Sequence, residues 1–317
     1  MRYLFLFFLL LFNAKLKAQQ TFKAKFDSFK KLEIDSGITL TFDEPDQLKT
    51  ALPTKLIIFA LPNGNTTAQS FGKQLAPGDD WHFDIQHIGA QTAFIRKADP
   101  QTNYIVVYAE NSLKAWPAWR RKFANSDERI ANLVKLIESH YAQYHPQLIL
   151  TSHSGGGSFI FGYINAQQLL PANLVRIGFL DATYGYETDK HQSKLANWLK
   201  LPNKSLQVIA YNDSVVTYNG KPLVSPTGGT WYRSQLLAKD LVVAGQLQKQ
   251  EFEDRISFRN RQGTTAFILI KNPAAKIFHT VLVEKNGFIQ LVLAGTKFED
   301  KGYKFWKDRA YASFILP

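Results

Sequence analysis

The chain has 317 residues, a formal net charge of +12 at pH 7 and no cysteine. The lack of cysteine excludes disulfides, a thiol nucleophile, a Cys-ligated metal and a lipid attached to cysteine. No basic run is longer than 120–122 and no nucleic-acid-binding motif is present, so the charge predicts a basic surface and no nucleic-acid partner.

Residues 1–18 have the pattern of a secretory signal peptide. Arg2 precedes an unbroken apolar run over 3–12, which is too short to cross a bilayer as a helix. Ala18 provides a cleavage site, although Leu16 at the −3 position is larger than usual. Cleavage there lowers the formal charge from +12 to +9, and no later run is apolar enough to span a membrane. We expect an exported mature chain, periplasmic or secreted, with a single domain over 19–317.

The first half of this domain contains a hairpin, two strands and a helix. Residues 32–42 alternate apolar and polar side chains around a Ser-Gly turn, which predicts an antiparallel hairpin at the edge of a sheet. The apolar runs 56–60 and 104–108 predict buried strands. Ser126 begins a segment with apolar residues at helical spacing, which predicts a helix to about residue 144.

Strands and helices alternate in the second half. Strands are expected over 148–150, 175–180, 206–211 and 266–270, and helices start near 158 and within 230–250. This alternation predicts an α/β fold with a mostly parallel sheet and helices on both faces. Ligands of such sheets bind at the carboxyl ends of the strands.

The stretch 148–164 carries the clearest motif. An apolar strand leads into Ser152-His153-Ser154 and three glycines, and an apolar helix follows. This order resembles the nucleophile elbow of the α/β-hydrolase superfamily, in which a serine sits on a strained turn between strand and helix. Ser152 departs from the glycine that is common there. The resemblance implies Ser154 as the nucleophile and the N–H of Gly155 as an oxyanion donor.

A serine hydroxyl needs a base, and the base needs a carboxylate to fix its tautomer. In the superfamily the order along the chain is Ser, acid, His. Only His191 and His279 follow Ser154, and we favour His279 because it lies after the last expected strand. For the acid we favour Asp213, at the end of the second strand after the elbow strand, with Asp181 as the alternative.

The second oxyanion donor should come from the loop 61–67, which follows the strand 56–60. The His-Gly pair common in the family is absent there. The Asn-Gly turn in this loop makes the backbone N–H of Asn65 the first candidate and that of Gly64 the second.

Two aromatic segments, near 66–103 and 111–125, are predicted to form lid or insert loops. Trp81, Trp116 and Trp119 are candidates for substrate binding, and the alternative is that they pack these segments onto the core. His82, His87 and Asp84 lack the spacing of a known metal site, so we expect no metal.

Together these features predict an exported serine hydrolase that cleaves an ester, or an amide, through an acyl-enzyme on Ser154. The substrate would be a small molecule or a cell-envelope ester or amide, and no cofactor is implied. The alternative is a non-catalytic ligand- or glycan-binding protein on the same fold, because fold does not determine function. The sequence does not decide acyl length, oligomeric state or which aspartate is the acid.

Overall fold

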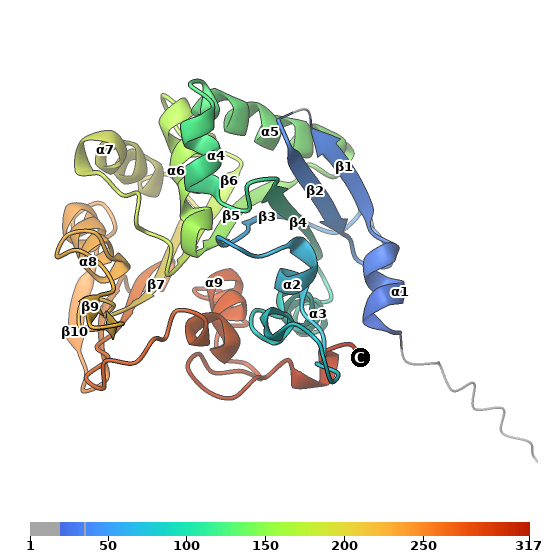
Figure 1. Ribbon diagram of the computed structural model, residues 1–317. Helices are drawn as coiled ribbons and strands as arrows, with labels where there is room; N and C mark the ends of the chain where they lie inside the picture. Colours follow the sequence, from blue (N-terminus) through green and yellow to red (C-terminus); the bar gives the residue numbers. More distant parts are fainter. Residues whose placement is uncertain (1–19, 35) are drawn as a thin grey trace, which may run out of the picture.

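The computed structural model describes residues 20–34 and 36–317. The predicted signal peptide lies outside the described residues. Ten strands of the described chain form one sheet (Figure 1). In spatial order they are β1 (Lys30–Ile34), β2 (Ile38–Asp43), β4 (Asn103–Asn111), β3 (Thr54–Ala60), β5 (Gln147–His153), β6 (Leu174–Leu180), β7 (Ser205–Tyr211), β12 (Thr265–Ile270), β11 (Arg255–Arg259) and β10 (Gln248–Glu251).

The centre of the sheet is parallel and both of its ends are antiparallel. Strands β4, β3, β5, β6, β7 and β12 pair in parallel, whereas β1, β2, β11 and β10 pair antiparallel with their neighbours. The predicted α/β class and the N-terminal edge hairpin are therefore confirmed. Strand β4 lies on one side of β3, and β5 and the strands after it lie on the other side. The strand order therefore changes direction at β3. Sheets of this kind bind their ligands in the crevice at such a point.

Helices cover both faces of the sheet (Figure 1). The described helices are α1 (Phe22–Asp27), α2 (Thr67–Phe71), α3 (Ile88–Ala98), α4 (Trp116–Lys122), α5 (Ser126–His140), α6 (Gly157–Ala166), α7 (Thr188–Leu199), α8 (Thr230–Leu241) and α9 (Phe288–Leu293). Helices α4 to α8 enclose one apolar cluster, and α2, α3 and α9 enclose the other. None of these helices is long and apolar enough to cross a membrane.

The central strands are apolar on both faces because both faces are covered. In β3, Leu56 and Ile58 point into the cluster under α4 to α8, and Ile57 and Phe59 point into the opposite one. All four side chains are fully buried. Continuous apolar runs are typical of parallel strands buried in this way.

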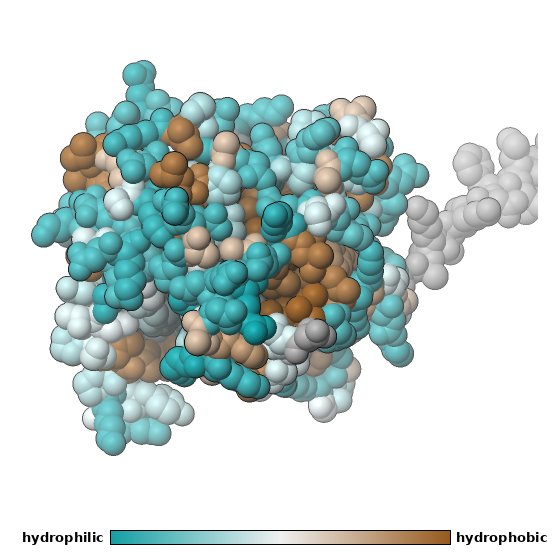
Figure 2. Space-filling view, turned by 90° about the horizontal axis from the view of Figure 1, so that it is seen from above, coloured by the Kyte–Doolittle hydropathy of each residue, from teal (hydrophilic) through white to brown (hydrophobic). Residues whose placement is uncertain are grey.

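Seen from the side of α4 and α5, the surface is mostly hydrophilic with compact hydrophobic patches (Figure 2).

The structure differs from the sequence-based expectation in two segments. The segment 66–103 contains α2 and α3, and the buried Ile88 and Ile95 attach α3 to the sheet. The antiparallel pair β10–β11 was not predicted, because the exposed strand β10 has no apolar alternation to mark it. Smaller elements are the hairpin β8 (Thr217–Tyr218) and β9 (Lys221–Pro222), a kinked turn over Val283–Gly287 and single-turn helices at Trp81–Asp84, Ala142–Tyr144, Ser154–Gly156 and Ala312–Phe314.

Candidate active site

Ser154 occupies a strained turn between β5 and α6. Its φ is +53°, in the left-handed region that side chains other than glycine rarely adopt. A single turn, Ser154–Gly156, joins the strand directly to the helix. Backbone strain of this kind persists only where surrounding packing enforces it. The tight strand–turn–helix geometry expected from the sequence is therefore present.

The three glycines after Ser154 are required by close packing. A Cβ at Gly156 would lie 2.1 Å from the carbonyl oxygen of Ala60, at the end of β3. A Cβ at Gly157 would lie 1.8 Å from the carbonyl oxygen of Ala182, just beyond β6. The elbow thus fits between the ends of its two neighbouring strands only without side chains at these positions.

Ser152 takes the place of the usual glycine and is completely buried. Its hydroxyl has no hydrogen-bond partner within the described chain. The strand nevertheless keeps its pairing there, because Ser152 lies opposite Ala60 of β3 and Phe179 of β6. The departure from glycine therefore does not disrupt the elbow.

His279 is hydrogen-bonded to Asp181, the alternative acid. The His279 Nδ1 and the Asp181 Oδ2 are 2.5 Å apart. Asp181 follows β6 directly, is fully buried and has a φ of +47°. An ionised carboxylate only accepts hydrogen bonds, so Nδ1 carries the proton and donates it, and Nε2 of the neutral ring is left as an acceptor. The ring is in the tautomer that a general base for a serine requires.

Asp213, the acid favoured from the sequence, does not contact His279. Its carboxylate accepts hydrogen bonds from the backbone N–H of Thr230 at 2.8 Å and of Trp231 at 3.3 Å. These are the first residues of α8, whose amide groups have no partner inside the helix, so Asp213 acts as a helix cap. The expectation of Asp213 as the partner of the histidine is therefore wrong for this geometry.

Thr230 links the two aspartates, and the sequence analysis missed it. Its hydroxyl donates to Asp181 Oδ1 and lies 3.3 Å from Asp213 Oδ2. Burial, followed by the charge of Asp181, raises the pKa of Asp213. Thr230 is the first residue of α8 and follows two glycines. This pattern predicts a helix start in the sequence, but it does not indicate which residue the Thr230 hydroxyl binds.

The ring of His153, the residue directly before Ser154, packs against the ring of His279. The two ring centroids are 4.6 Å apart, and His153 Nε2 donates to the carbonyl oxygen of His279 at 3.1 Å. Burial, followed by the proximity of His279, lowers the pKa of His153 well below its ordinary value. A neutral His153 therefore holds the loop that carries His279 without adding a charge next to it.

Two candidate oxyanion donors are free to bind. The N–H groups of Gly155 and Asn65 donate to no residue within 20–34 and 36–317. The Gly64 N–H, by contrast, donates to the carbonyl oxygen of Lys114 at 2.8 Å. Gly64, predicted as the second candidate, is therefore already engaged. The Asn63 side chain packs against Gly155, since a Cβ there would lie 1.9 Å from its Oδ1.

The tryptophans divide into two groups. Trp116 and Trp119 belong to α4 and are buried in the core, and their ring N–H groups donate to the carbonyl oxygens of Ala109 and Ser36. Of the two roles considered for them, packing onto the core holds and substrate binding does not, because the apolar ring surfaces are used for packing. Trp81 is 61% exposed and stacks on His82, so it keeps a free ring face.

The histidines near Trp81 are held by carboxylates. Asp80 binds His82 at 2.5 Å, and Asp84 binds both His87 at 2.7 Å and Arg309 at 2.6 Å. Arginine is not a metal ligand and competes for the Asp84 oxygen. Within the described parts of the chain no group of three or more His, Asp or Glu side chains has the geometry of a metal site.

Comparison with known proteins gives the fold. No protein-family model matches the chain, and no curated protein matches it. A thermostable esterase is similar over 85% of this chain, with a TM-score of 0.52 and 12% sequence identity. The chain has an α/β-hydrolase fold. It spans 64% of the length of that esterase.

Other esterases show weaker structural similarity to the chain. An acetyl xylan esterase from Aspergillus awamori has a TM-score of 0.44 at 10% identity and matches 77% of this chain and 93% of its own. The siderophore hydrolase EstB from Aspergillus nidulans has a TM-score of 0.45 at 11% identity and matches 84% of this chain and 93% of its own.

Proposed function

We propose that the protein is an exported serine hydrolase that cleaves an ester bond through an acyl-enzyme on Ser154. The observation that carries this proposal is the 2.5 Å contact between His279 Nδ1 and Asp181 Oδ2, beside a serine on a left-handed turn. Ser154 and Asp181 directly follow strands β5 and β6, and the loop after β12 carries His279. The three groups therefore lie at the carboxyl ends of the parallel strands, where α/β proteins bind their ligands.

The reaction begins with attack of the Ser154 hydroxyl on the ester carbonyl. The Ser154 hydroxyl has no hydrogen-bond partner within the described chain, and the proposed reaction requires it to come within hydrogen-bond reach of His279 Nε2 when substrate binds. The ring takes the hydroxyl proton as the Oγ–carbon bond forms. Asp181 stabilises the resulting imidazolium and does not itself take the proton.

The negative charge of the tetrahedral intermediate would be bound by the N–H groups of Gly155 and Asn65. Gly155 lies in the first turn leading into α6, where the helix dipole adds a positive potential. Collapse of the intermediate breaks the carbon–oxygen bond of the ester, and His279 returns the proton to the leaving alcohol. Water then repeats the sequence on the acyl-enzyme and releases the carboxylic acid.

An amide substrate follows the same steps with an amine as leaving group. The binding-protein alternative loses one support, because Trp116 and Trp119 are buried and offer no surface to a glycan. Export rests on the residues 1–18 and is tested by N-terminal sequencing of the mature protein, which should begin near Gln19.

The test of this proposal is covalent labelling with a fluorophosphonate, which reacts with activated serines. Wild type should be labelled, and Ser154→Ala should abolish labelling. His279→Ala should slow labelling by about 10³-fold or more, because the base is lost. Ser158→Ala, four residues along in α6, is the matched control and should be labelled like wild type. A folded wild-type protein that is not labelled would contradict the proposal.

A further inference from the structure

A polar cavity lies at the amino ends of the parallel strands, opposite the ends that carry Ser154 and Asp181. It measures about 290 Å³ and is lined by the first residues of several parallel strands. We call it the basal cavity and define it by Lys55, Arg176, Lys204, Ser205 and Thr264. Strand β5 has seven residues and runs from this cavity to Ser154. At about 3.3 Å per residue, the two sites are about 20 Å apart.

Three cations line the basal cavity, and no acidic residue does. Arg176 and Lys204 are each only 7% exposed. None of the three has an ion pair with a carboxylate of residues 20–34 or 36–317. Lys204 donates to the carbonyl oxygen of Ala172 and Lys55 to the side chain of Gln147, which are both neutral. Burial of cations without counter-charges is costly, so this arrangement favours binding of an anion.

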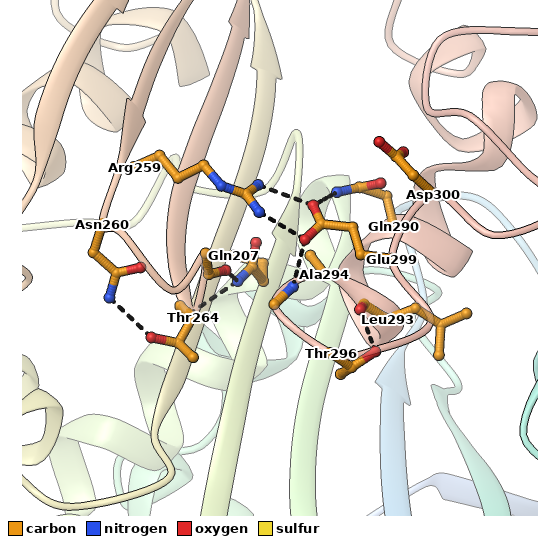
Figure 3. A network of polar contacts seen from close by, with 12 residues as sticks. Gln207, Arg259, Asn260, Thr264, Gln290, Leu293, Ala294, Thr296, Glu299 and Asp300 are labelled. Atoms are coloured by element: carbon orange, nitrogen blue, oxygen red, sulfur yellow. Dashed lines mark hydrogen bonds and ion pairs between the residues drawn. The ribbon is translucent and has the colours of Figure 1, made fainter.

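The nearby carboxylates are used elsewhere. Glu299 receives four hydrogen bonds, two from Arg259 and one each from Gln290 and the Gly295 N–H (Figure 3). Burial, followed by the charge of Arg176, lowers the pKa of Lys55, and Asp99 opposes this shift only in part. Asp99 also accepts from the hydroxyl of Tyr104 at 3.0 Å. Two carboxylates near three cations leave an excess of positive charge in the cavity.

Arg176 also has a structural role, but this role does not explain why Lys55 and Lys204 lie beside it. It donates to the carbonyl oxygens of Leu291 and Ala294, at the C-terminal end of α9. These bonds use two of the five donors of a guanidinium group and do not involve Lys55 or Lys204. Burial lowers the pKa of Arg176 to about 10, so the group stays charged at neutral pH.

Two hydroxyl groups complete the lining as donors. Ser205 Oγ accepts from Gln207 Nε2 at 3.1 Å, and Thr264 Oγ1 accepts from Asn260 Nδ2 at 2.8 Å. Figure 3 shows Thr264 and Asn260 at this end of the sheet. Since both hydroxyl oxygens accept from an amide, their own hydrogens are left to donate to a ligand.

We propose that the basal cavity binds phosphate, either as the free ion or as a small phosphomonoester. A tetrahedral oxyanion accepts hydrogen bonds on every oxygen, which matches a lining of guanidinium, ammonium and hydroxyl donors. The volume is at the lower limit of about 300 Å³ for ligand pockets, so the ligand is small. The site is independent of the hydrolase chemistry proposed above.

The test is calorimetric titration of the mature protein with inorganic phosphate at low ionic strength. Ser154 is first blocked with a fluorophosphonate, so that phosphate cannot bind at the active site. Lys204→Gln and Lys55→Gln should each weaken binding about tenfold or more, because a hydrogen bond to a charged group contributes about 1.5–3 kcal/mol. The matched control is Lys200→Gln, which removes the same charge from an exposed site and should bind within about twofold of wild type.

Two results would overturn the proposal. One is the absence of saturable binding to wild type up to about 10 mM phosphate, a concentration well above the Kd of a specific site. The other is unchanged binding by both lysine variants when circular dichroism shows that they are folded. Titration with glycerol 3-phosphate, with glycerol as its control, distinguishes a phosphomonoester from the free phosphate ion as the ligand. Tighter binding than inorganic phosphate identifies a phosphomonoester as the ligand, and equal or weaker binding identifies the free ion.

Discussion

Two aspartates lie close together behind His279, but only one of them contacts it. Asp181 binds the imidazole, whereas Asp213 binds the start of α8. We expect Asp181→Asn to slow fluorophosphonate labelling of Ser154 by about 10³–10⁴-fold, because an amide no longer fixes the tautomer of the ring. Asp213→Asn should slow labelling less than about tenfold and lower stability by about 1 kcal/mol, the contribution of a helix cap. Labelling rates that rank in the reverse order would identify Asp213 as the acid.

Thr230 offers a finer test of the same group of residues. Its hydroxyl donates to the Asp181 oxygen that His279 does not use. Thr230→Val keeps the shape and removes this donor, so the carboxylate is held less firmly. We expect labelling to slow by about tenfold, the equivalent of one hydrogen bond of about 1.4 kcal/mol to a charged group. Thr230→Ser keeps the hydroxyl, and recovery of the wild-type rate in this variant checks that the hydrogen bond is responsible.

His191, the other histidine after Ser154, is a buried structural residue. Its Nδ1 accepts from the Glu187 N–H at 2.9 Å, and its Nε2 lies 2.9 Å from Asn165 Oδ1, so the ring is neutral. Burial lowers the pKa of His191 to about 4 from an ordinary value of 6.5. The unfolded chain therefore binds a proton that the folded chain does not, and stability is lost as the pH falls from about 6.5 to about 4.

His191→Gln should reduce this pH dependence. The expected change is about 1.4 kcal/mol per pH unit in the slope of the unfolding free energy over that window. Urea denaturation at pH 7, 6, 5 and 4 measures it. The exposed His145 provides the control, because His145→Gln should leave the slope unchanged. Equal slopes for wild type and His191→Gln would show that His191 is not kept neutral by the fold.

The elbow shows how neighbouring elements determine a local sequence. Gly157→Ala would place a methyl group 1.8 Å from the carbonyl oxygen of Ala182, and neither backbone can move without disturbing β6 or α6. We expect a loss of about 3 kcal/mol, as for a severe overpacking change. Gly220 has a positive φ but no neighbour within 4 Å, so Gly220→Ala should cost only about 1 kcal/mol of backbone strain. The midpoints of urea denaturation compare the two variants, and similar losses would refute the packing explanation.

Across the whole molecule, Arg309 ties the C-terminal segment to two distant parts of the chain. It binds Asp84 at 2.6 Å and Glu284 at 3.2 Å. Arg309→Met should destabilise the protein by about 1 kcal/mol, since these carboxylates are partly exposed and solvent weakens the pairs. Limited proteolysis should then cut first within 303–317. Lys307→Met, on the exposed part of the same segment, is the control and should leave the cleavage pattern unchanged.

Local patterns determined the order of elements in this chain and the position of the elbow. Apolar runs marked the central strands because these are buried on both faces, and the glycines after Ser154 marked a turn that admits no side chain. The same patterns placed Ser154, His279 and both aspartates at strand ends or in the loops that follow them. Such information is local, because periodicity and turn chemistry depend on residues close together in the sequence.

Only the tertiary structure decided which aspartate meets His279, because both follow parallel strands and share the same sequence signature. The choice depends on α8, whose first amide groups bind Asp213 and whose Thr230 supports Asp181. Burial of Trp116 and Trp119, engagement of Gly64 and the grouping of cations in the basal cavity likewise depend on contacts between distant segments. Long-range packing sets these environments, and a single sequence contains no local pattern that records them.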